Sequence, residues 1–139
     1  MTLRLASRHL LALRRRSEEA YPEECCGFLL GRPHKGVKEV AAVRPSANAA
    51  ESGPDRRYRI PAEAYFDAQR DAGQRGLAVV GFYHSHPDAP AEPSEEDRAG
   101  ALPGVSMVII SVENGRAGAA RSWLLAGDRS RFDPEPLDG

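Results

Sequence analysis

The stretch Leu77-Ala78-Val79-Val80-Gly81-Phe82-Tyr83-His84-Ser85-His86-Pro87 decides how this chain folds. Its first seven residues are apolar or glycine, so Leu77–Tyr83 is predicted to be a buried strand. This strand runs directly into two histidines separated by one serine. Because successive side chains of a strand point to opposite faces, His84 and His86 are expected to share a face and Ser85 to point away from them.

A carboxylate follows the two histidines across a proline-rich loop, Asp88–Pro93. Asp97 lies eleven residues after His86, and Ser94 three residues before Asp97 resembles the N-cap of a short helix. Two imidazoles and one carboxylate form a three-ligand set that leaves the fourth zinc position open for a water whose pKa falls to about 7. The alternative is a pair of structural histidines beside a surface loop, which would suit an isolated H-x-H better than this longer pattern.

Two adjacent carboxylates, Glu23 and Glu24, lie at the start of the apolar run Cys25–Gly31. Either one could take a proton from a bound water and pass it to a leaving amine, and either could be a solvated loop residue. Their spacing does not distinguish them. Cys25 and Cys26 would point to opposite faces of a strand, and we expect them to be small buried hydrophobic residues rather than ligands.

On both sides of the Leu77–Pro87 segment, the sequence predicts strands that alternate with three helices. Helices are predicted from an N-cap at Ser7 to about Ala20, from Pro61 at a first helical position to about Arg75, and from Ser94 to about Ala101. Strands are predicted at Thr2–Ala6, Cys25–Gly31, Val37–Val43, Arg56–Ile60, Leu77–Tyr83, Val105–Val112 and Arg121–Leu125, with turns at His34-Lys35-Gly36 and around Asn114-Gly115. The expected fold class is α/β or α+β, a mixed β-sheet packed between helices.

Length and charge limit the functional classes. The chain has 139 residues, enough for one domain, which we place at residues 1–126 and follow with a polar, loosely ordered tail at 127–139. A net charge of −1 argues against electrostatic binding to nucleic acid or membranes, and no apolar run approaches the roughly 20 residues of a membrane span. The two adjacent cysteines offer no disulfide framework, so the cytoplasm is the expected location.

Three segments together resemble the JAMM/MPN+ zinc metalloprotease family: Glu24-Cys25-Cys26-Gly27-Phe28-Leu29-Leu30-Gly31, His84-Ser85-His86-Pro87 and Ser94-Glu95-Glu96-Asp97. The resemblance extends from about Leu10 to Leu125 and includes Arg57-Tyr58-Arg59-Ile60-Pro61. It implies a JAMM/MPN fold similar to the cytidine-deaminase-like architecture, with one zinc ion per chain. It also implies roles for five residues: zinc ligands at His84, His86 and Asp97, a general acid/base at Glu24 rather than Glu23, and an oxyanion-stabilising hydroxyl at Ser94.

The resemblance also implies a substrate. Compact bacterial members cut after the C-terminal Gly-Gly of small ubiquitin-like sulfur-carrier proteins and release cysteine or a conjugated amine. Where ubiquitin-chain isopeptidases of the family carry insertions, this chain has only the Ala47–Asp55 loop and the Gly100–Gly104 turn. We therefore expect a zinc metallopeptidase or isopeptidase that acts on such a carrier or its conjugate, with Asn48 as a candidate for holding the peptide backbone.

Two other functions were weighed against this one. A non-catalytic MPN scaffold would bind partner proteins, but such members typically lack the zinc ligands that this chain keeps. A zinc nucleobase deaminase would need H-x-E and a distant P-C-x-x-C pair, and the sequence has no second cysteine pair.

Overall fold

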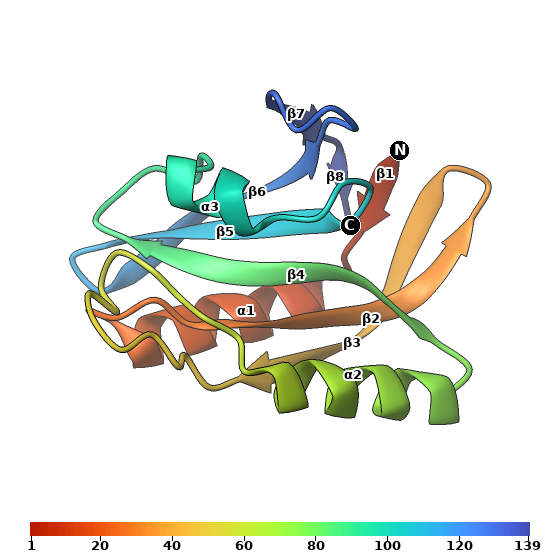
Figure 1. Ribbon diagram of the computed structural model, residues 1–139, viewed down its shortest axis with the longest axis horizontal. Coiled ribbons are helices and arrows are strands. Elements are labelled where there is room, and N and C mark those ends of the chain that lie inside the picture. The colour runs from red at the N-terminus through yellow and green to blue at the C-terminus, as the bar shows by residue number, and fades with distance from the viewer.

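One mixed β-sheet organises the molecule, and the computed structural model describes all of residues 1–139 (Figure 1). The elements are β1 (Thr2–Arg4), α1 (Ser7–Ala20), β2 (Cys26–His34), β3 (Val37–Ser46), α2 (Ala62–Gln74), β4 (Ala78–Pro87), α3 (Glu95–Gly100), β5 (Ser106–Glu113), β6 (Arg116–Leu125), β7 (Phe132–Glu135) and β8 (Leu137–Asp138). The sheet order is β7-β6-β5-β4-β2-β3-β1-β8. The β4–β5, β1–β3 and β1–β8 pairs are parallel and the others antiparallel, so the predicted mixed sheet is confirmed.

Two tight hairpins have the sequence signals that predict them. Lys35 and Gly36 both have positive φ, as do Asn114 and Gly115. Two consecutive positive φ values match the type I′ turn, whose twist fits the strands on either side. The hairpin of β2 and β3 is therefore confirmed, and β6 begins directly after the second turn, five residues earlier than predicted.

The helices cover the two faces of the sheet. On one face α1 packs against β3, β5 and β6, and Figure 1 shows it behind the central strands. On the other face α2 packs against β2 and β4, where Ala68 and Ala72 are buried against Phe28 and Leu30. Along β4, Tyr83 belongs to the α1-side core and Phe82 packs on the α2 side. Because side chains alternate between the two faces of a strand, His84 and His86 lie on the same face as Phe82, which is the α2 side.

The predicted strand at Arg56–Ile60 is wrong. Arg56 lies in a turn, and residues 57–60 have no regular secondary structure and pair with the loop before them rather than with the sheet. The backbone N–H of Arg59 donates to Asn48 Oδ1 (3.1 Å), and the N–H of Ala49 donates to the carbonyl of Arg59 (2.8 Å). The alternating pattern suggested a strand, but the partners of this segment are an asparagine side chain and a loop.

Two predicted helix starts are displaced by one residue. Ala6 rather than Ser7 precedes α1, and no side chain caps that end. Pro61 precedes α2 instead of occupying its first position, and its ψ of 144° is extended. In both helices the carbonyl of the residue before the helix already accepts a backbone hydrogen bond. Ala6 accepts from the Leu10 N–H, and Pro61 accepts from the Tyr65 N–H.

The C-terminal segment is ordered, contrary to the loosely held tail predicted for residues 127–139. Strand β7 pairs with β6 at one edge of the sheet and β8 pairs with β1 at the other. Glu135 is buried, and its Oε2 lies 3.9 Å from Nζ of Lys38. In the sequence, this charged stretch with prolines resembles a free tail. The residues that hold it in place lie far away along the chain, so the local sequence gives no sign of them. No helix of the structure is long and apolar enough to cross a membrane.

Candidate metal and catalytic site

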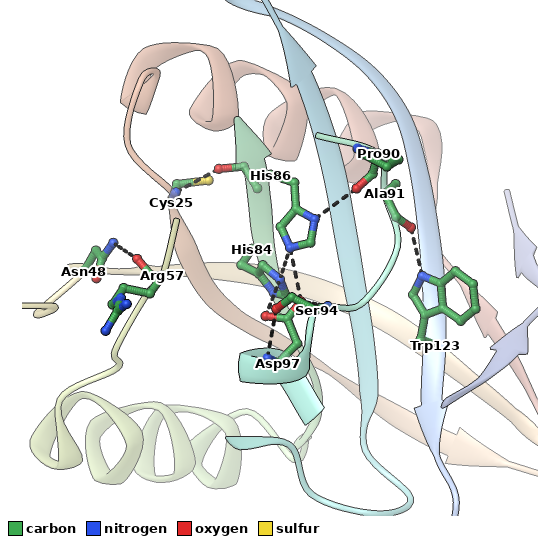
Figure 2. Close-up of polar contacts among 11 residues, drawn as sticks. Cys25, Asn48, Arg57, His84, His86, Pro90, Ala91, Ser94, Asp97 and Trp123 are labelled. Atoms are coloured by element: carbon green, nitrogen blue, oxygen red, sulfur yellow. Dashed lines mark hydrogen bonds and ion pairs between the residues drawn. The ribbon is translucent and has the colours of Figure 1, made fainter. Parts of the chain in front are cut away.

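Strand β4 directs both histidine side chains to one point, as the alternation of side chains along a strand predicted (Figure 2). His84 is fully buried and His86 is nearly so. Their Nε2 atoms lie 3.1 Å apart. The strand extends through both residues to Pro87, because β5 pairs with it in parallel along this whole length.

The chain returns to this point through α3. Asp97 places Oδ1 3.2 Å from His84 Nε2 and Oδ2 3.1 Å from His86 Nε2. A capping box holds the aspartate, because the Ser94 hydroxyl accepts from the Asp97 N–H (3.0 Å) while the Ser94 N–H donates to Asp97 Oδ2 (2.9 Å). The predicted helix cap at Ser94 is confirmed, and the cap also orients the carboxylate.

Each histidine ring has one further contact that restricts its orientation. His86 Nδ1 lies 2.9 Å from the Pro90 carbonyl oxygen, so Nδ1 carries a proton, and loss of the Nε2 proton that donates to Asp97 would leave Nε2 as the nitrogen that can bind a metal ion. Tyr58 stacks on His84, with ring centroids 4.4 Å apart. The sequence reasoning did not find this role of Tyr58, because the two residues are far apart along the chain and no spacing connects them.

The structure distinguishes Glu23 from Glu24. Glu23 is exposed, whereas Glu24 is buried and belongs to a cluster with His84 and His86 whose potential ligand atoms all lie within 4.8 Å of one another. The Glu24 N–H donates to the Pro54 carbonyl (2.7 Å). Its carboxylate oxygen Oε1 is buried and has no hydrogen-bond partner.

Asn48 holds the Glu24 segment in place. Its Nδ2 donates to the carbonyls of Glu24 and Arg57, both at 3.1 Å, and its Oδ1 accepts from the N–H groups of Ala50 and Arg59. Because all these bonds lie within the chain, the structure uses Asn48 to join the two loops beside the site. The sequence suggested Asn48 as a residue that holds the peptide backbone of a substrate, whereas its amide is bonded to four backbone groups of this chain.

The two carboxylates beside the histidines have opposite electrostatic character. Burial raises the pKa of Glu24 to about 8, with neighbouring acidic groups adding to the effect and His86 opposing it. Burial would also raise the pKa of Asp97, but hydrogen bonds with His84 and His86 outweigh it and hold that pKa well below its usual range. Asp97 is therefore an anion at neutral pH, and Glu24 takes up and releases a proton near neutrality.

Ser85 and Cys25 point away from the site, whereas Cys26 pairs with His84 across β2 and β4 and lies on the same face of the sheet. Ser85 accepts a hydrogen bond from the Cys25 N–H (2.8 Å) and thereby joins β4 to the start of β2. Cys26 is buried, and burial raises the pKa of its thiol to about 12. Cys25 packs against the α1-side core. Neither thiol belongs to the histidine cluster.

The donor set fits a divalent metal ion. The distances of 3.1 to 3.2 Å among His84, His86 and Asp97 are close to the edge of about 3.3 Å that a tetrahedron with metal–ligand bonds near 2.0 Å requires. Imidazole nitrogen and carboxylate oxygen are ligands that zinc accepts. The unpartnered Oε1 of Glu24 adds a buried polar atom beside the same point. The residues therefore can hold a metal ion, whose identity the geometry leaves open among N/O-binding metals.

A cleft of about 300 Å³ opens beside Asp97. The segment 57–60 forms one wall, and the α3–β5 connection with Leu102 and Val105 forms another. The backbone N–H and C=O groups of Arg57 and Arg59 face the Asn48 loop, whereas those of Tyr58 and Ile60 form no hydrogen bond. The wall of the cleft therefore contains unpaired backbone N–H and C=O groups of Tyr58 and Ile60 beside an apolar floor.

A sheet that holds two strand histidines and a helix-borne aspartate beside a buried glutamate defines the class of metal-dependent hydrolases. The model of one family, described as prokaryotic homologues of the JAB domain, matches residues 6–126, and the chain belongs to this family. It is a JAMM-type hydrolase.

Curated relatives and solved structures agree with this assignment. The chain is 35% identical to a desampylase of Haloferax volcanii, over 79% of this chain and 75% of the relative. It is 34% identical to a probable TtuB-protein conjugate cleaving protease of Thermus thermophilus, over 69% of this chain and 61% of the relative. A solution structure of a Desulfitobacterium hafniense protein is similar with a TM-score of 0.85 and 29% identity, covering 98% of this chain and 91% of that one. A JAB1/MPN domain protein from Archaeoglobus fulgidus shares the fold, with a TM-score of 0.54 and 20% identity over the full length of both chains.

Proposed function

We propose that the protein is a cytoplasmic zinc isopeptidase that hydrolyses the bond after the C-terminal Gly-Gly of a small ubiquitin-like sulfur-carrier protein. The products are the free carrier and either cysteine or a conjugated amine. The observation that carries the proposal is the convergence of His84, His86 and Asp97 beside the buried Glu24. The names of the Haloferax and Thermus relatives, a desampylase and a conjugate-cleaving protease, support a modified protein as the substrate.

The different pKa values of the carboxylates support their separate roles. A metal ligand must be deprotonated, and Asp97 has the lowered pKa that this requires. A general acid/base works best with a pKa near the operating pH, and burial raises the pKa of Glu24 to about 8. We therefore assign His84, His86 and Asp97 as metal ligands and Glu24 as the general acid/base.

Zinc in this site would supply a Lewis acid and lower the pKa of water to about 7. Glu24 accepts a proton from the attacking water at its carboxylate and delivers it to the nitrogen of the leaving amine. The Ser94 hydroxyl accepts from the Asp97 N–H through its oxygen, so its own proton remains able to donate to the developing oxyanion. Capping and catalysis therefore use different parts of the same hydroxyl.

The cleft suits an extended tail without bulky side chains. The unpaired backbone groups of Tyr58 and Ile60 can pair with an added strand, and the apolar floor includes Phe82 and Met107. Two glycines next to the scissile bond would let the tail pass close to Asp97. The proposed catalytic domain covers residues 1–126, and the C-terminal strands complete its sheet.

The test uses purified zinc-loaded protein and a sulfur-carrier whose C-terminal Gly-Gly is joined to cysteine or to a lysine amine of a second protein. We expect release of the free carrier, loss of release in Glu24→Ala, and retained release in the matched control Glu23→Ala. Full activity of Glu24→Ala would overturn the mechanism. The scaffold alternative predicts instead that the protein purifies without stoichiometric zinc and releases nothing.

A further inference from the structure

The loop 88–93 connects the histidine strand β4 to the helix that carries Asp97. Three consecutive carbonyl groups of this loop each accept a hydrogen bond from a side chain. Ser111 Oγ donates to the carbonyl of Ala89 (2.6 Å), His86 Nδ1 donates to that of Pro90 (2.9 Å), and Trp123 Nε1 donates to that of Ala91 (3.0 Å). Figure 2 shows the last two bonds side by side.

Ser111 and Trp123, which donate to the carbonyls before and after that of Pro90, come from different strands, β5 and β6. The start of the loop is held as well, because Asp88 accepts hydrogen bonds from Tyr21 Oη (2.6 Å) and the Asn114 N–H (2.9 Å). The Pro90 carbonyl therefore lies between two anchored peptide groups. Pro90 itself has no N–H with which to hold its position.

The position of this carbonyl matters because it determines the state of the His86 ring. While the carbonyl accepts from Nδ1, that nitrogen keeps its proton, so in the neutral ring Nε2, which faces His84 and Asp97, is the nitrogen available to a metal ion. If the carbonyl moved away, the proton could shift to Nε2 and the ring could rotate. Either change would remove the Nε2 lone pair from the site.

We infer that Ser111 and Trp123 are positioning residues for the metal site: by anchoring the carbonyls of Ala89 and Ala91 they hold the Pro90 carbonyl on His86 Nδ1 and so fix the tautomer and direction of that ring. Neither residue contacts the proposed ligands through its donor group. The inference rests on the proposed function, since it takes His86 as a metal ligand.

A purely structural role is the competing explanation for Trp123, because its ring packs in a buried cluster with Ala91, Ala101 and Met107. Ser111 separates the two explanations, since it is only half-buried and its hydroxyl has one partner, the Ala89 carbonyl. Ser111→Ala removes that donor, and Ser111→Thr restores a hydroxyl at the same position. Trp123→Phe removes the indole N–H and keeps an aromatic ring. Ser122→Ala is the matched control, since it deletes a buried hydroxyl on β6 that donates to Glu135 and not to the loop.

Two measurements test the inference. The first is the zinc affinity of each purified variant, in competition with a chromophoric chelator. The second is the fraction of the Nδ1–H tautomer of His86 in the metal-free protein, read from 15N-histidine NMR spectra at a pH above the titration of the ring. For Ser111→Ala combined with Trp123→Phe we expect affinity to fall about tenfold, the lower end of the range for groups that orient a ligand. The Nδ1–H fraction should fall with it. Ser111→Thr should restore both values, and Ser122→Ala should leave both unchanged.

Unchanged affinity and an unchanged tautomer in Ser111→Ala and in the double variant would overturn the inference. Equal losses in Ser122→Ala would also overturn it, because they would show a general effect of stability. His86→Ala distinguishes failure of the proposed function: if that variant binds zinc as tightly as the unmodified protein, His86 is not a ligand. If the Trp123 variant does not fold, Ser111→Ala and its rescue by Ser111→Thr decide the question alone.

Discussion

Three carboxylates near the site show how surroundings assign roles to residues of similar chemistry. Glu23 is exposed, Glu24 is buried with an unpartnered oxygen, and Asp97 is buried with hydrogen bonds to two imidazoles. The same burial that raises the pKa of Glu24 to about 8 is overcome at Asp97 by its partners. At the scale of single residues, the number of hydrogen-bond partners rather than the residue type separates the proposed metal ligand from the proposed proton carrier.

The two uses of the Ser94 hydroxyl can be separated by substitution. Glycine at an N-cap costs only a few tenths of a kcal/mol, whereas alanine costs about 1 kcal/mol. Ser94→Gly should therefore leave the thermal midpoint nearly unchanged while kcat falls about 10²- to 10³-fold, because an oxyanion donor is lost. Ser94→Ala should lower kcat by the same factor and also destabilise the protein. Retention of kcat in Ser94→Gly would restrict Ser94 to its capping role.

At the scale of elements, the site depends on the close pairing of β2 with its neighbours. Gly31 lies at a register shift between β2 and β3, and a Cβ at this position would collide with the backbone carbonyl of Glu39. Strand β2 begins two residues after Glu24 and pairs with the β4 strand that bears His84. Any change that separates these strands would move Glu24, the proposed acid/base, relative to the proposed metal ligands.

Gly31→Ala is expected to destabilise the protein by about 1–3 kcal/mol, as overpacking of a tight contact does. Gly73→Ala is the matched control, because a Cβ there meets nothing within 4 Å and alanine is favoured over glycine in a helix interior by about 1 kcal/mol. Urea denaturation should therefore shift the two midpoints in opposite directions. Equal shifts would show that the close approach at Gly31 is not what holds the strands.

Sequence patterns predicted well the elements that follow from local rules and need no particular partner residue. Strand β4 and the cap at Ser94 follow from local rules of alternation and capping. The segment Arg56–Ile60 and the C-terminal segment were assigned wrongly, because each depends on particular partners: Asn48 and Ala49 for the first, and β1, β6 and Lys38 for the second. The same limit explains why Tyr58 and Trp123 carried no signal in the sequence, although both contact the surroundings of the histidines.

At the scale of the whole molecule, residues 132–138 hold the two edges of the sheet together. Strand β7 lies against β6 and, one residue later, β8 lies against β1. Between the edges, Glu135 accepts from Ser122 Oγ (2.7 Å) and lies beside Lys38, whose Nζ also donates to the Gly104 carbonyl (2.9 Å) and to Ser106 Oγ (2.9 Å). Because Ser106 lines the cleft, this buried network connects the C-terminal segment to the proposed substrate groove.

The network predicts a strong coupling between two residues that are distant in sequence. Glu135→Leu leaves the Lys38 charge buried without its carboxylate, which should cost about 3–5 kcal/mol of unfolding free energy. The double variant Lys38→Met, Glu135→Leu should be far less destabilised than the sum of its single variants, since apolar side chains of similar size replace the pair. The exposed pair Arg131–Asp133, in the same segment, is the control: Asp133→Leu should cost no more than about 1 kcal/mol. If Glu135→Leu costs as little as Asp133→Leu, the buried pair does not hold the segment, and closure of the sheet must rest on the backbone pairing of β7 and β8 alone.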